Sequence, residues 1–300
     1  MPFTAVRLPR FRRVPDALSI RLTPRDHEIM GHVFRHRFLR STHLVALVTG
    51  SPQHVLRRLQ RLFHHGYLDR PRAQIERYTT GSKAMVYGVG TQGIKLLEER
   101  LGIPRRRLDW TARNRSVNRY FLDHALAVAD ILVKLEVACR AGGHTQLIHP
   151  RQPHEPSIHW KVTIHHRDSP ATVGVVPDAV FGLRTPGQPD AWFFLEADRA
   201  TMPVVRRSLS QTSLLRKMVA YHETWRQKVL AGTLPRFRVL VATSTPQRSS
   251  HILDAYREIG QGRGTGLLLF TDHRRLLDCE DPLHEPVVSN GHGDAVVLTE

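Results

Sequence analysis

Cysteine is nearly absent from this sequence: among 300 residues only Cys139 and Cys279 occur, far apart and outside any CxxC pair. A disulfide framework or a structural zinc site needs more thiols at closer spacing, so neither is expected. The 19 histidines form no HExxH or comparable pattern of metal ligands. The sequence therefore gives no support to a protein organised around zinc or disulfides.

Long apolar runs are missing as well. No segment approaches the roughly 20 uncharged apolar residues that cross a bilayer, and the N-terminal MPFTAVRLPRFRRVP has no apolar core of signal-peptide length. The glycine-rich segment 260–266 precedes an expected strand, whereas a phosphate-binding loop follows one. Because 41% of the residues are hydrophobic, the chain can still build a core. We expect a soluble, cytoplasmic protein without membrane association.

Acidic residues are scarce in the first two fifths of the chain. Residues 1–120 contain 24 Lys and Arg against 8 Asp and Glu, a net charge of +16, whereas residues 121–300 contain 20 against 19. Lysine is also rare, because 38 of the 44 basic residues are arginine. Arginine suits bidentate contacts with phosphates and guanine. The uneven charge indicates a polyanion-binding module joined to a neutral one.

Three helices are expected in the basic part. Residues 24–37 and 41–48 carry apolar side chains at helical spacing. The strongest signal is the third, PQHVLRRLQRLFHH at 52–65, which Ser51 caps and Gly66 ends. This third helix is predicted to bury one apolar stripe, formed by Val55, Leu56, Leu59, Leu62 and Phe63.

Two extended segments follow, at about 74–79 and 84–89, joined by the turn TGSK and followed by the helix TQGIKLLEERLG. Three helices and a hairpin are the element order of a winged helix, whose third helix enters the major groove of DNA. We expect a winged-helix DNA-binding domain at 20–112, after a flexible basic arm at 1–19. The alternative is that the arginines of the third helix only solvate its outer face. The expected phosphate and base-edge contacts are Gln53, Arg57, Arg58, Gln60, Arg61, Lys83, Arg12 and Arg13.

The neutral part is expected to form a mixed α/β sheet flanked by helices at 113–275, with an acidic, loosely ordered tail at 276–300. The fold class is thus α/β (α+β), with two domains. The expected helices lie at 116–141, 204–231 and 247–260, and the expected strands at 144–149, 160–166, 173–183, 191–197, 236–244 and 266–272.

Carboxylates interrupt two of these apolar strands. In VVPDAVFGLRTPGQPDAWFFLEADRAT, residues 175–201, Asp178 breaks one apolar run, and Glu196 and Asp198 close another. If the strands pair antiparallel about residue 187, Asp178 faces Glu196, and the two-residue period puts Asp198 on the same face. Clustered acids repel one another, and Mg²⁺ or Mn²⁺ relieves that repulsion by binding their oxygens. This arrangement predicts a divalent-cation site, where a bound cation activates water beside a phosphoryl group.

Several motifs in order resemble a known family. The sequence resembles the replication-relaxation family of plasmid and mobile-element proteins, which pairs a winged helix with a PD-(D/E)xK, restriction-endonuclease-like domain. The resemblance covers most of residues 20–272 and implies DNA binding linked to plasmid replication, relaxation or mobilisation. The motifs that carry it are GYL, MVYGVGTQGIKLL, NRYFLDHALAVAD, VPDAVF, FFLEADRAT and LLRKMVAYHETW.

The resemblance also implies site residues, position by position. Asp178 matches the PD acid and Glu196 the acid of the (D/E)xK element, but Asp198 stands where the lysine belongs. Lys217, one helical turn before Tyr221, is the candidate replacement for that lysine. The implied catalytic residues are Asp178, Glu196, Asp198 and Lys217, with Mg²⁺ or Mn²⁺ held by the three acids. The alternative is a degraded site in which Lys217 is an ordinary surface residue.

We therefore expect a DNA-binding protein of a plasmid or integrated element that acts in replication, relaxation or mobilisation, with a nuclease-like domain used for binding. Two alternatives stay open: a Mg²⁺-dependent endonuclease or nickase, and a winged-helix transcriptional repressor. The expected partners are double-stranded DNA and replication, relaxase or recombination proteins. A homodimer, located at the nucleoid or on the plasmid, is a further expectation.

Overall fold

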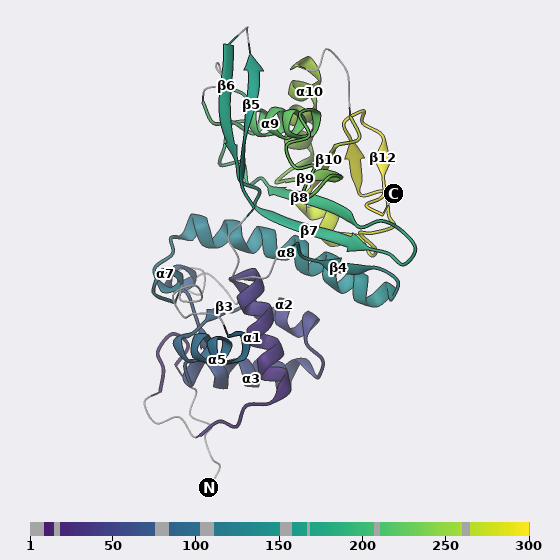
Figure 1. Ribbon diagram of the computed structural model, residues 1–300. Helices are drawn as coiled ribbons and strands as arrows, with labels where there is room; N and C mark the ends of the chain where they lie inside the picture. The colour runs from purple at the N-terminus through teal and green to yellow at the C-terminus, as the bar shows by residue number, and fades with distance from the viewer. Residues whose placement is uncertain are drawn as a thin grey trace. The chain divides into compact units, whose positions relative to one another are not determined.

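The computed structural model describes residues 9–14, 19–75, 84–102, 111–150, 158–166, 169–206, 211–259 and 265–299. The chain divides into two compact units, called unit 1 (essentially Met1–Ala129) and unit 2 (essentially Asp130–Glu300). The division falls within the long helix α8 (Arg119–Gly142), which matches the helix predicted at 116–141. In Figure 1 the chain colour runs from purple in unit 1 to yellow at the end of unit 2. The mixed α/β class predicted from the sequence is confirmed.

Unit 1 contains the three predicted helices, α1 (Pro24–His36), α2 (Ser41–Leu47) and α3 (Pro52–His64). The N-cap of α3 is the predicted one, because the Ser51 hydroxyl accepts a hydrogen bond from the His54 amide. The buried stripe of α3 differs from the prediction at one position, since Leu56 is 44% exposed. The other four members of the stripe are buried: Val55, Leu59, Leu62 and Phe63.

A small antiparallel sheet completes unit 1, in the order β1 (Leu39–Arg40), β3 (Val86–Val89), β2 (Leu68–Asp69). The strand predicted at 74–79 is wrong at its start, because a 3-10 turn covers Arg72–Gln74. The Gln74 side chain bonds both backbone groups of Val86, donating to its carbonyl at 2.9 Å and accepting from its amide at 2.8 Å. A side-chain amide thus replaces the strand partner. Residues 76–83, with the TGSK turn and Lys83, lie outside the described residues.

Two glycines allow the next helix, α5 (Thr91–Leu101), to lie close against the chain before β2. A Cβ built on Gly93 would stand 2.4 Å from the Tyr67 carbonyl oxygen, and one on Gly90 would stand 2.3 Å from that of Gly66. No other residue fits at these positions without moving the backbone. After α5 the structure describes a short helix, α7 (Thr111–Arg115).

Unit 2 is built on a seven-stranded sheet in the order β12-β11-β10-β9-β8-β7-β4. The three central strands β8, β9 and β10 run parallel, and the flanking pairs are antiparallel. The strands, in chain order, are β4 (Gln146–Ile148), β7 (Ala179–Arg184), β8 (Ala191–Ala197), β9 (Phe237–Thr243), β10 (Leu268–Asp272), β11 (Val288–Asn290) and β12 (Ala295–Val296).

The C-terminal segment is part of this sheet, which corrects the expectation of a loosely ordered tail. After α11 (His273–Asp278), β11 pairs with β10 and β12 pairs with β11. Val288 and Leu298 are fully buried. The few apolar residues among the charges and prolines of this segment are the ones that the sheet and its core use.

The single strand predicted at 173–183 is two strands. Strand β6 (Ser169–Val175) pairs with β5 (Trp160–His166) in a separate antiparallel hairpin, and β7 begins after Pro177 in the main sheet. Proline cannot donate a hydrogen bond to a neighbouring strand, so pairing stops there. The break places Asp178 immediately before β7.

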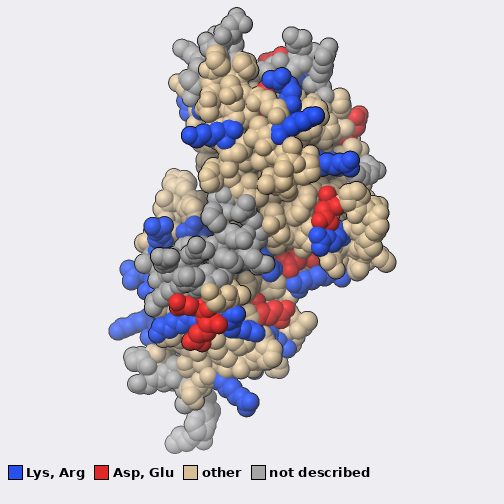
Figure 2. Space-filling view, in the orientation of Figure 1, with Lys and Arg blue, Asp and Glu red and all other residues tan. Residues whose placement is uncertain are grey.

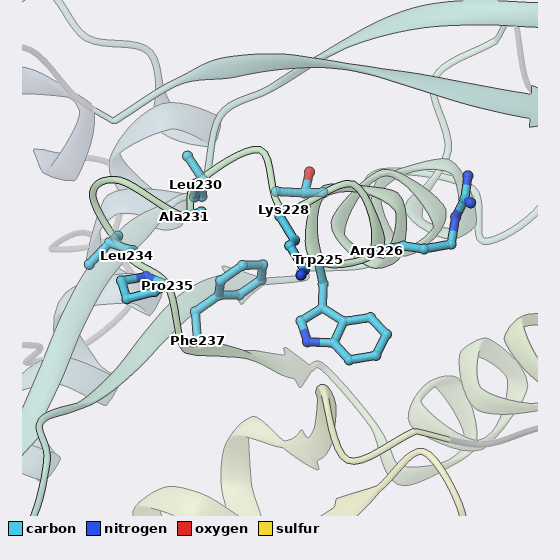
Figure 3. A pocket seen from close by; sticks show the side chains of 9 residues that line it. Trp225, Arg226, Lys228, Leu230, Ala231, Leu234, Pro235 and Phe237 are labelled. Carbon is cyan, nitrogen blue, oxygen red and sulfur yellow. The ribbon is translucent and has the colours of Figure 1, made fainter.

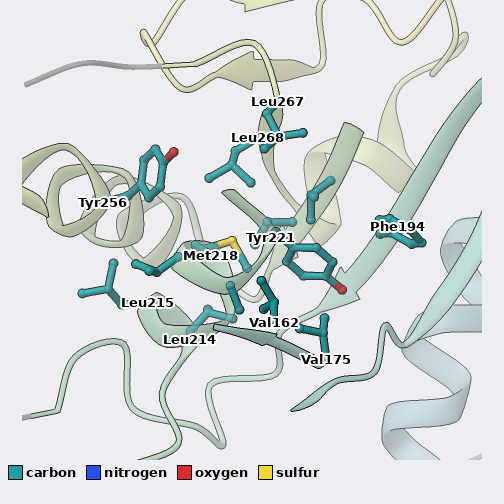
Figure 4. Close-up of a cluster of buried hydrophobic side chains, with 14 of the residues drawn as sticks. Val162, Val175, Phe194, Leu214, Leu215, Met218, Tyr221, Tyr256, Leu267 and Leu268 are labelled. Carbon is teal, nitrogen blue, oxygen red and sulfur yellow. The ribbon is translucent and has the colours of Figure 1, made fainter. Parts of the chain in front are cut away.

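Helices α9 (Leu214–Arg226) and α10 (Pro246–Ile259) lie on one side of the sheet, and the part of α8 in unit 2 lies on the other (Figure 1). Helix α9 is shorter than the predicted 204–231: Ser213 caps its start, and Lys228 adopts a left-handed φ of 53° after its end. The largest buried cluster joins α9 and α10 to the sheet and to the β5–β6 hairpin, with Met218, Tyr221 and Phe194 among its members (Figure 4). In the described part of the chain, no helix combines the length and apolar character that crossing a membrane requires.

Candidate functional site

The pairing of β7 with β8 sets the geometry of the acidic residues. The observed partners run from Ala179 with Leu195 to Leu183 with Ala191, which is the register predicted from the sequence. Asp178 directly precedes β7, so this register places it beside Glu196 at the end of β8. Glu196 shares its sheet face with Phe194, which packs against Tyr221 of α9, so this acid points toward α9.

Glu196 is buried, 2% exposed, and both of its oxygens have a hydrogen-bond donor from α9. Lys217 Nζ lies 2.6 Å from Oε2, and the Tyr221 hydroxyl donates to Oε1 at 2.7 Å. The two donors are four residues apart and therefore on one face of the helix. The structure thus brings Lys217 to the acid at the end of β8, although 21 residues of sequence separate them.

The charge of this cluster is only partly balanced. Burial raises the pKa of Glu196 to about 7, Asp178 adds to the rise, and Lys217 and Tyr221 act against it. For Lys217, burial alone would lower the pKa, but Glu196, Asp178 and Asp198 together raise it above its ordinary value. Burial, with Glu196 and Asp178, raises the pKa of Tyr221 far enough to keep its hydroxyl protonated. Asp178 and Glu196 therefore share one cation, Lys217, and burial is the main reason that ionisation of Glu196 is unfavourable.

Asp178 is held by the backbone of the neighbouring strand. Its Oδ2 accepts a hydrogen bond from the Ala197 amide at 2.9 Å, and its own amide donates to the Leu195 carbonyl at 3.0 Å. These two bonds attach Asp178 to the end of β8 on both sides of Glu196. Asp178 is consequently fixed beside Glu196 and only half-buried.

Asp198 belongs to a different interaction. Arg248, near the start of α10, binds both of its oxygens, with 2.9 Å between Nη2 and Oδ1, and also donates to the Met202 carbonyl. Among the described residues, Asp178, Glu196 and Asp198 do not bring one oxygen each within 4.8 Å of one another. No sequence pattern indicates Arg248, because 50 residues and a strand separate it from Asp198. The structure therefore groups Asp178, Glu196, Lys217 and Tyr221, and pairs Asp198 with Arg248.

The candidate DNA-contacting residues of unit 1 differ in what they touch. On α3, Gln53 and Arg57 are exposed, and Gln60 is half-buried. Arg57 has no ion-pair or hydrogen-bond partner among the described residues. These side chains surround the exposed Leu56 and leave an open polar face on the helix. Figure 2 shows Lys and Arg side chains on the visible face of both units.

Arg58, next in sequence to Arg57, has an internal partner. Its guanidinium bonds both oxygens of the buried Asp26 at 2.5 Å. Burial alone would raise the pKa of Asp26, but hydrogen bonds from Arg58 and from both Thr23 donors lower it below its usual range. Arg58 thus joins α3 to the first turn of α1.

Two of the other basic candidates, Arg61 and Arg13, form hydrogen bonds within the protein. Arg61 donates to the Ser19 carbonyl at 3.3 Å, whereas Arg12 is exposed. Arg13 donates to the Phe63 carbonyl at 2.9 Å and pairs with the buried Asp69. The described part of the predicted flexible arm is therefore attached to the end of α3. Lys83 lies outside the described residues.

A family model described as replication-relaxation matches residues 30–236, more than half of the chain. The chain belongs to the replication-relaxation family. Membership points to a role in the replication or relaxation of plasmid or mobile-element DNA. Searches of curated proteins and of solved structures each found no match.

The matched range of this replication-relaxation protein contains α3 and the whole Asp178–Glu196–Lys217–Tyr221 group. Arg248 lies beyond the match, so the family comparison does not cover the residue that neutralises Asp198. The resemblance predicted from the motifs is confirmed at the level of the family.

Proposed function

We propose that this replication-relaxation protein binds double-stranded DNA through α3 of unit 1, and that it does so in the replication or relaxation of a plasmid or mobile element. The observation that carries the proposal is the open face of α3, where Gln53 and Arg57 are exposed and Arg57 has no ion pair with any described residue. Three helices followed by two antiparallel strands agree with the winged-helix order, in which the third helix enters the major groove.

Charge supports the same proposal. A net charge of +16 over residues 1–120 attracts a polyanion, and arginine contacts phosphates and guanine edges. Arg58, by contrast, is neutralised by Asp26, and Arg13 by Asp69, so neither is free for DNA. The proposed contacts on this helix are therefore fewer than the sequence alone predicts.

The adjacent pair Arg57 and Arg58 provides a matched test. Arg57→Ala should weaken binding to a labelled duplex, and its plot of log affinity against log salt should become shallower by about 0.9 for each phosphate that the variant no longer neutralises. Its thermal stability should stay unchanged, because the side chain is exposed and forms no ion pair with a described residue. Arg58→Ala should instead destabilise unit 1 by leaving the Asp26 carboxylate buried without its partner.

Equal duplex affinity and equal salt slope for wild type and Arg57→Ala would remove α3 from the DNA interface. A protein that binds no duplex at low salt would end the proposal altogether. Leu101→Ala is a suitable control in the same unit, since Leu101 is 48% exposed and lies on α5, outside the proposed surface.

A second candidate function is metal-dependent nicking of DNA by unit 2, and the geometry of Asp178, Glu196 and Lys217 favours it. The donor chemistry fits a hard divalent cation at two of the three acids: Asp178 directly precedes β7 beside the end of β8, and burial, with Asp178 adding to it, raises the pKa of Glu196 to about 7. Asp198 does not fit, because the Arg248 guanidinium binds both of its oxygens. Lys217 and Tyr221 also bond both oxygens of Glu196, so a cation would use a remaining lone pair of that carboxylate. A cation held there would polarise a phosphoryl oxygen and its bound water.

In that function the protein's own residues have distinct roles. Asp178 and Glu196 would hold the cation, and Lys217 would orient water or stabilise charge that develops on phosphate. Tyr221 would keep the Glu196 carboxylate in position through its 2.7 Å hydrogen bond. The buried surroundings of Glu196 would strengthen each of these interactions.

Supercoiled plasmid incubated with Mg²⁺ or Mn²⁺ tests the second candidate. Metal-dependent nicking by the wild type, lost in Asp178→Asn and kept in Asp254→Asn, would establish it. Asp254 is exposed on α10, where it accepts a hydrogen bond from Ser250, and it serves as the matched control. Absence of nicking with either metal, while duplex binding persists, would leave DNA binding as the only activity of the proposal.

A further inference from the structure

Unit 2 contains a pocket at the end of α9 that the proposed function does not use. Its volume is about 420 Å³, within the usual range for small-ligand sites. The end of α9, the turns after it and the start of β9 form its walls (Figure 3). The lining residues are Thr224, Trp225, Arg226, Lys228, Leu230, Ala231, Leu234, Pro235 and Phe237.

The floor of the pocket is apolar and its rim is basic. Leu230, Leu234 and Phe237 belong to the main core cluster, each at most 9% exposed, so they give a fixed apolar surface. Arg226 and Lys228 stand at the rim, and the lining contains no carboxylate among the described residues. Glu223 binds Arg226, whereas Lys228 forms no ion pair with any described residue. An occupant with an apolar body and a negative charge matches these walls.

Trp225 is the exposed aromatic residue of this pocket. It is 53% exposed, although it is one of the largest apolar side chains of the protein. The His222 ring stacks on the indole with 6.0 Å between ring centroids, and it contacts the Tyr256 ring of the core edge-on with 6.2 Å between centroids. Burial lowers the pKa of His222, so at neutral pH the ring beside the indole is uncharged. Trp225 is thus held in place from one side while much of its surface stays accessible.

The backbone at Lys228 also stands out. Its φ of 53° is left-handed, a conformation that glycine usually supplies at the end of a helix. The amide of Lys228 donates to the Trp225 carbonyl at 3.2 Å, and the amide of Val229 donates to the Thr224 carbonyl at 3.1 Å. A lysine therefore occupies a glycine position, and its ammonium group lines the pocket beside Trp225 (Figure 3).

We propose that this pocket binds an unpaired nucleobase of a DNA single strand, with the base against Trp225 and the adjoining phosphate at Lys228. The inference rests on the proposal that the protein acts on DNA. Indole rings stack on bases of any sequence, and a cation beside the ring holds the backbone phosphate. The base must be unpaired, because a base inside a duplex does not expose its face.

The position on α9 connects the pocket to the acidic group. Lys217, Tyr221 and Trp225 follow one another at intervals of four residues, and eight residues of helix span about 12 Å. A strand whose phosphate lay near Lys217 would therefore run along the same helix toward Trp225. The pocket would then position single-stranded DNA next to the acidic group of the same unit.

Binding of a fluorescein-labelled oligothymidylate, about 16 nucleotides long, to the full-length protein tests this proposal. Trp225→Ala should weaken binding roughly tenfold by loss of stacking, and Trp225→Phe should retain most of the affinity. Lys228→Gln should make the salt dependence shallower by about 0.7. Val205→Ala, 47% exposed in the same unit, should bind like the wild type. Thermal unfolding should be unchanged in Trp225→Ala, because this side chain is not part of the core.

Four results would overturn the proposal. In Trp225→Ala, either an unchanged affinity for the oligothymidylate or an equal loss of affinity for a duplex and for the oligothymidylate would contradict it. Competition by thymidine monophosphate as strong as that by the oligonucleotide would indicate a free-nucleotide site, and altered self-association of the variant without altered DNA binding would indicate a subunit interface. Failure of the proposed function is a separate result, since it concerns duplex binding and Arg57. A wild-type protein that binds the duplex but does not bind the oligothymidylate would refute only the pocket.

Discussion

At the scale of single residues, Glu196 is a carboxylate whose ionisation is unfavourable in the folded protein. It is buried at the end of an apolar strand, and its two donors do not bring its pKa back to the ordinary value of 4.5. A carboxylate that folds with a raised pKa binds its proton more tightly in the folded state than in the unfolded state. Its contribution to stability is therefore fully present below about pH 4.5 and is lost as the pH rises through about 7.

Glu196→Gln should remove that dependence. Between pH 4.5 and pH 7 the free energy of unfolding of the wild type should fall relative to that of the variant. The rise of the Glu196 pKa from 4.5 to about 7 on folding corresponds to a fall on the order of 3 kcal/mol. Urea unfolding at a series of pH values measures this difference. Glu223→Gln is the control, because hydrogen bonds from Arg226 and Gln227 outweigh burial and lower the pKa of Glu223, so its variant should keep the wild-type slope. Parallel curves for wild type and Glu196→Gln would contradict the prediction.

The sequence could predict part of this site but not all of it. The Asp178–Glu196 pairing follows from strand period and a symmetric hairpin, and the nearness of Lys217 to Tyr221 follows from helical spacing. The Arg248–Asp198 and Arg58–Asp26 pairs depend on how distant helices and strands pack, and no local pattern encodes that. Two adjacent arginines on α3 look equivalent in sequence, yet one is exposed and the other bonds a buried carboxylate.

At the scale of elements, caps and periodicity predicted helices better than they predicted strands. Ser51 marks the start of α3 in sequence and in structure, since a cap is a local interaction. Strand boundaries depend on partners that are distant in sequence. The side chain of Gln74 replaces a strand in unit 1, and Pro177 divides one apolar run between two sheets. The C-terminal segment was the largest error, because short strands that complete a sheet carry little pattern of their own.

Deletion of residues 286–300 tests the role of that segment. The truncated protein should lose the buried side chains of Val287, Val288 and Leu298, each worth about 2 kcal/mol, and β10 should become an exposed edge strand. The melting temperature should fall by more than about 5 °C, because a loss of several kcal/mol shifts a domain of this size by at least that much. Circular dichroism on heating measures the change, with His292→Ala as a control at an exposed position of the same segment. A truncated protein that melts with the wild type would show that the strands are dispensable.

At the scale of the whole molecule, charge and chemistry lie in different units. The basic excess belongs to the first 120 residues, whereas the acidic group and the Trp225 pocket belong to unit 2. Such a division suits a protein in which one unit binds a duplex and the other binds a strand that has left it. The proposals for α3 and for the pocket then describe two sites for one DNA molecule.

A duplex with a single-stranded overhang distinguishes two linked sites from two independent ones. If both units bind the same molecule, the second binding event is intramolecular, and the wild type should bind the junction much more tightly than either the duplex or the oligothymidylate alone. Arg57→Ala and Trp225→Ala should each remove this gain, and the double variant should bind no better than the weaker single variant. Fluorescence anisotropy with matched labels gives the affinities. Junction affinity equal to duplex affinity would mean that the units act on separate molecules, because a tethered second site cannot bind without adding to the binding free energy.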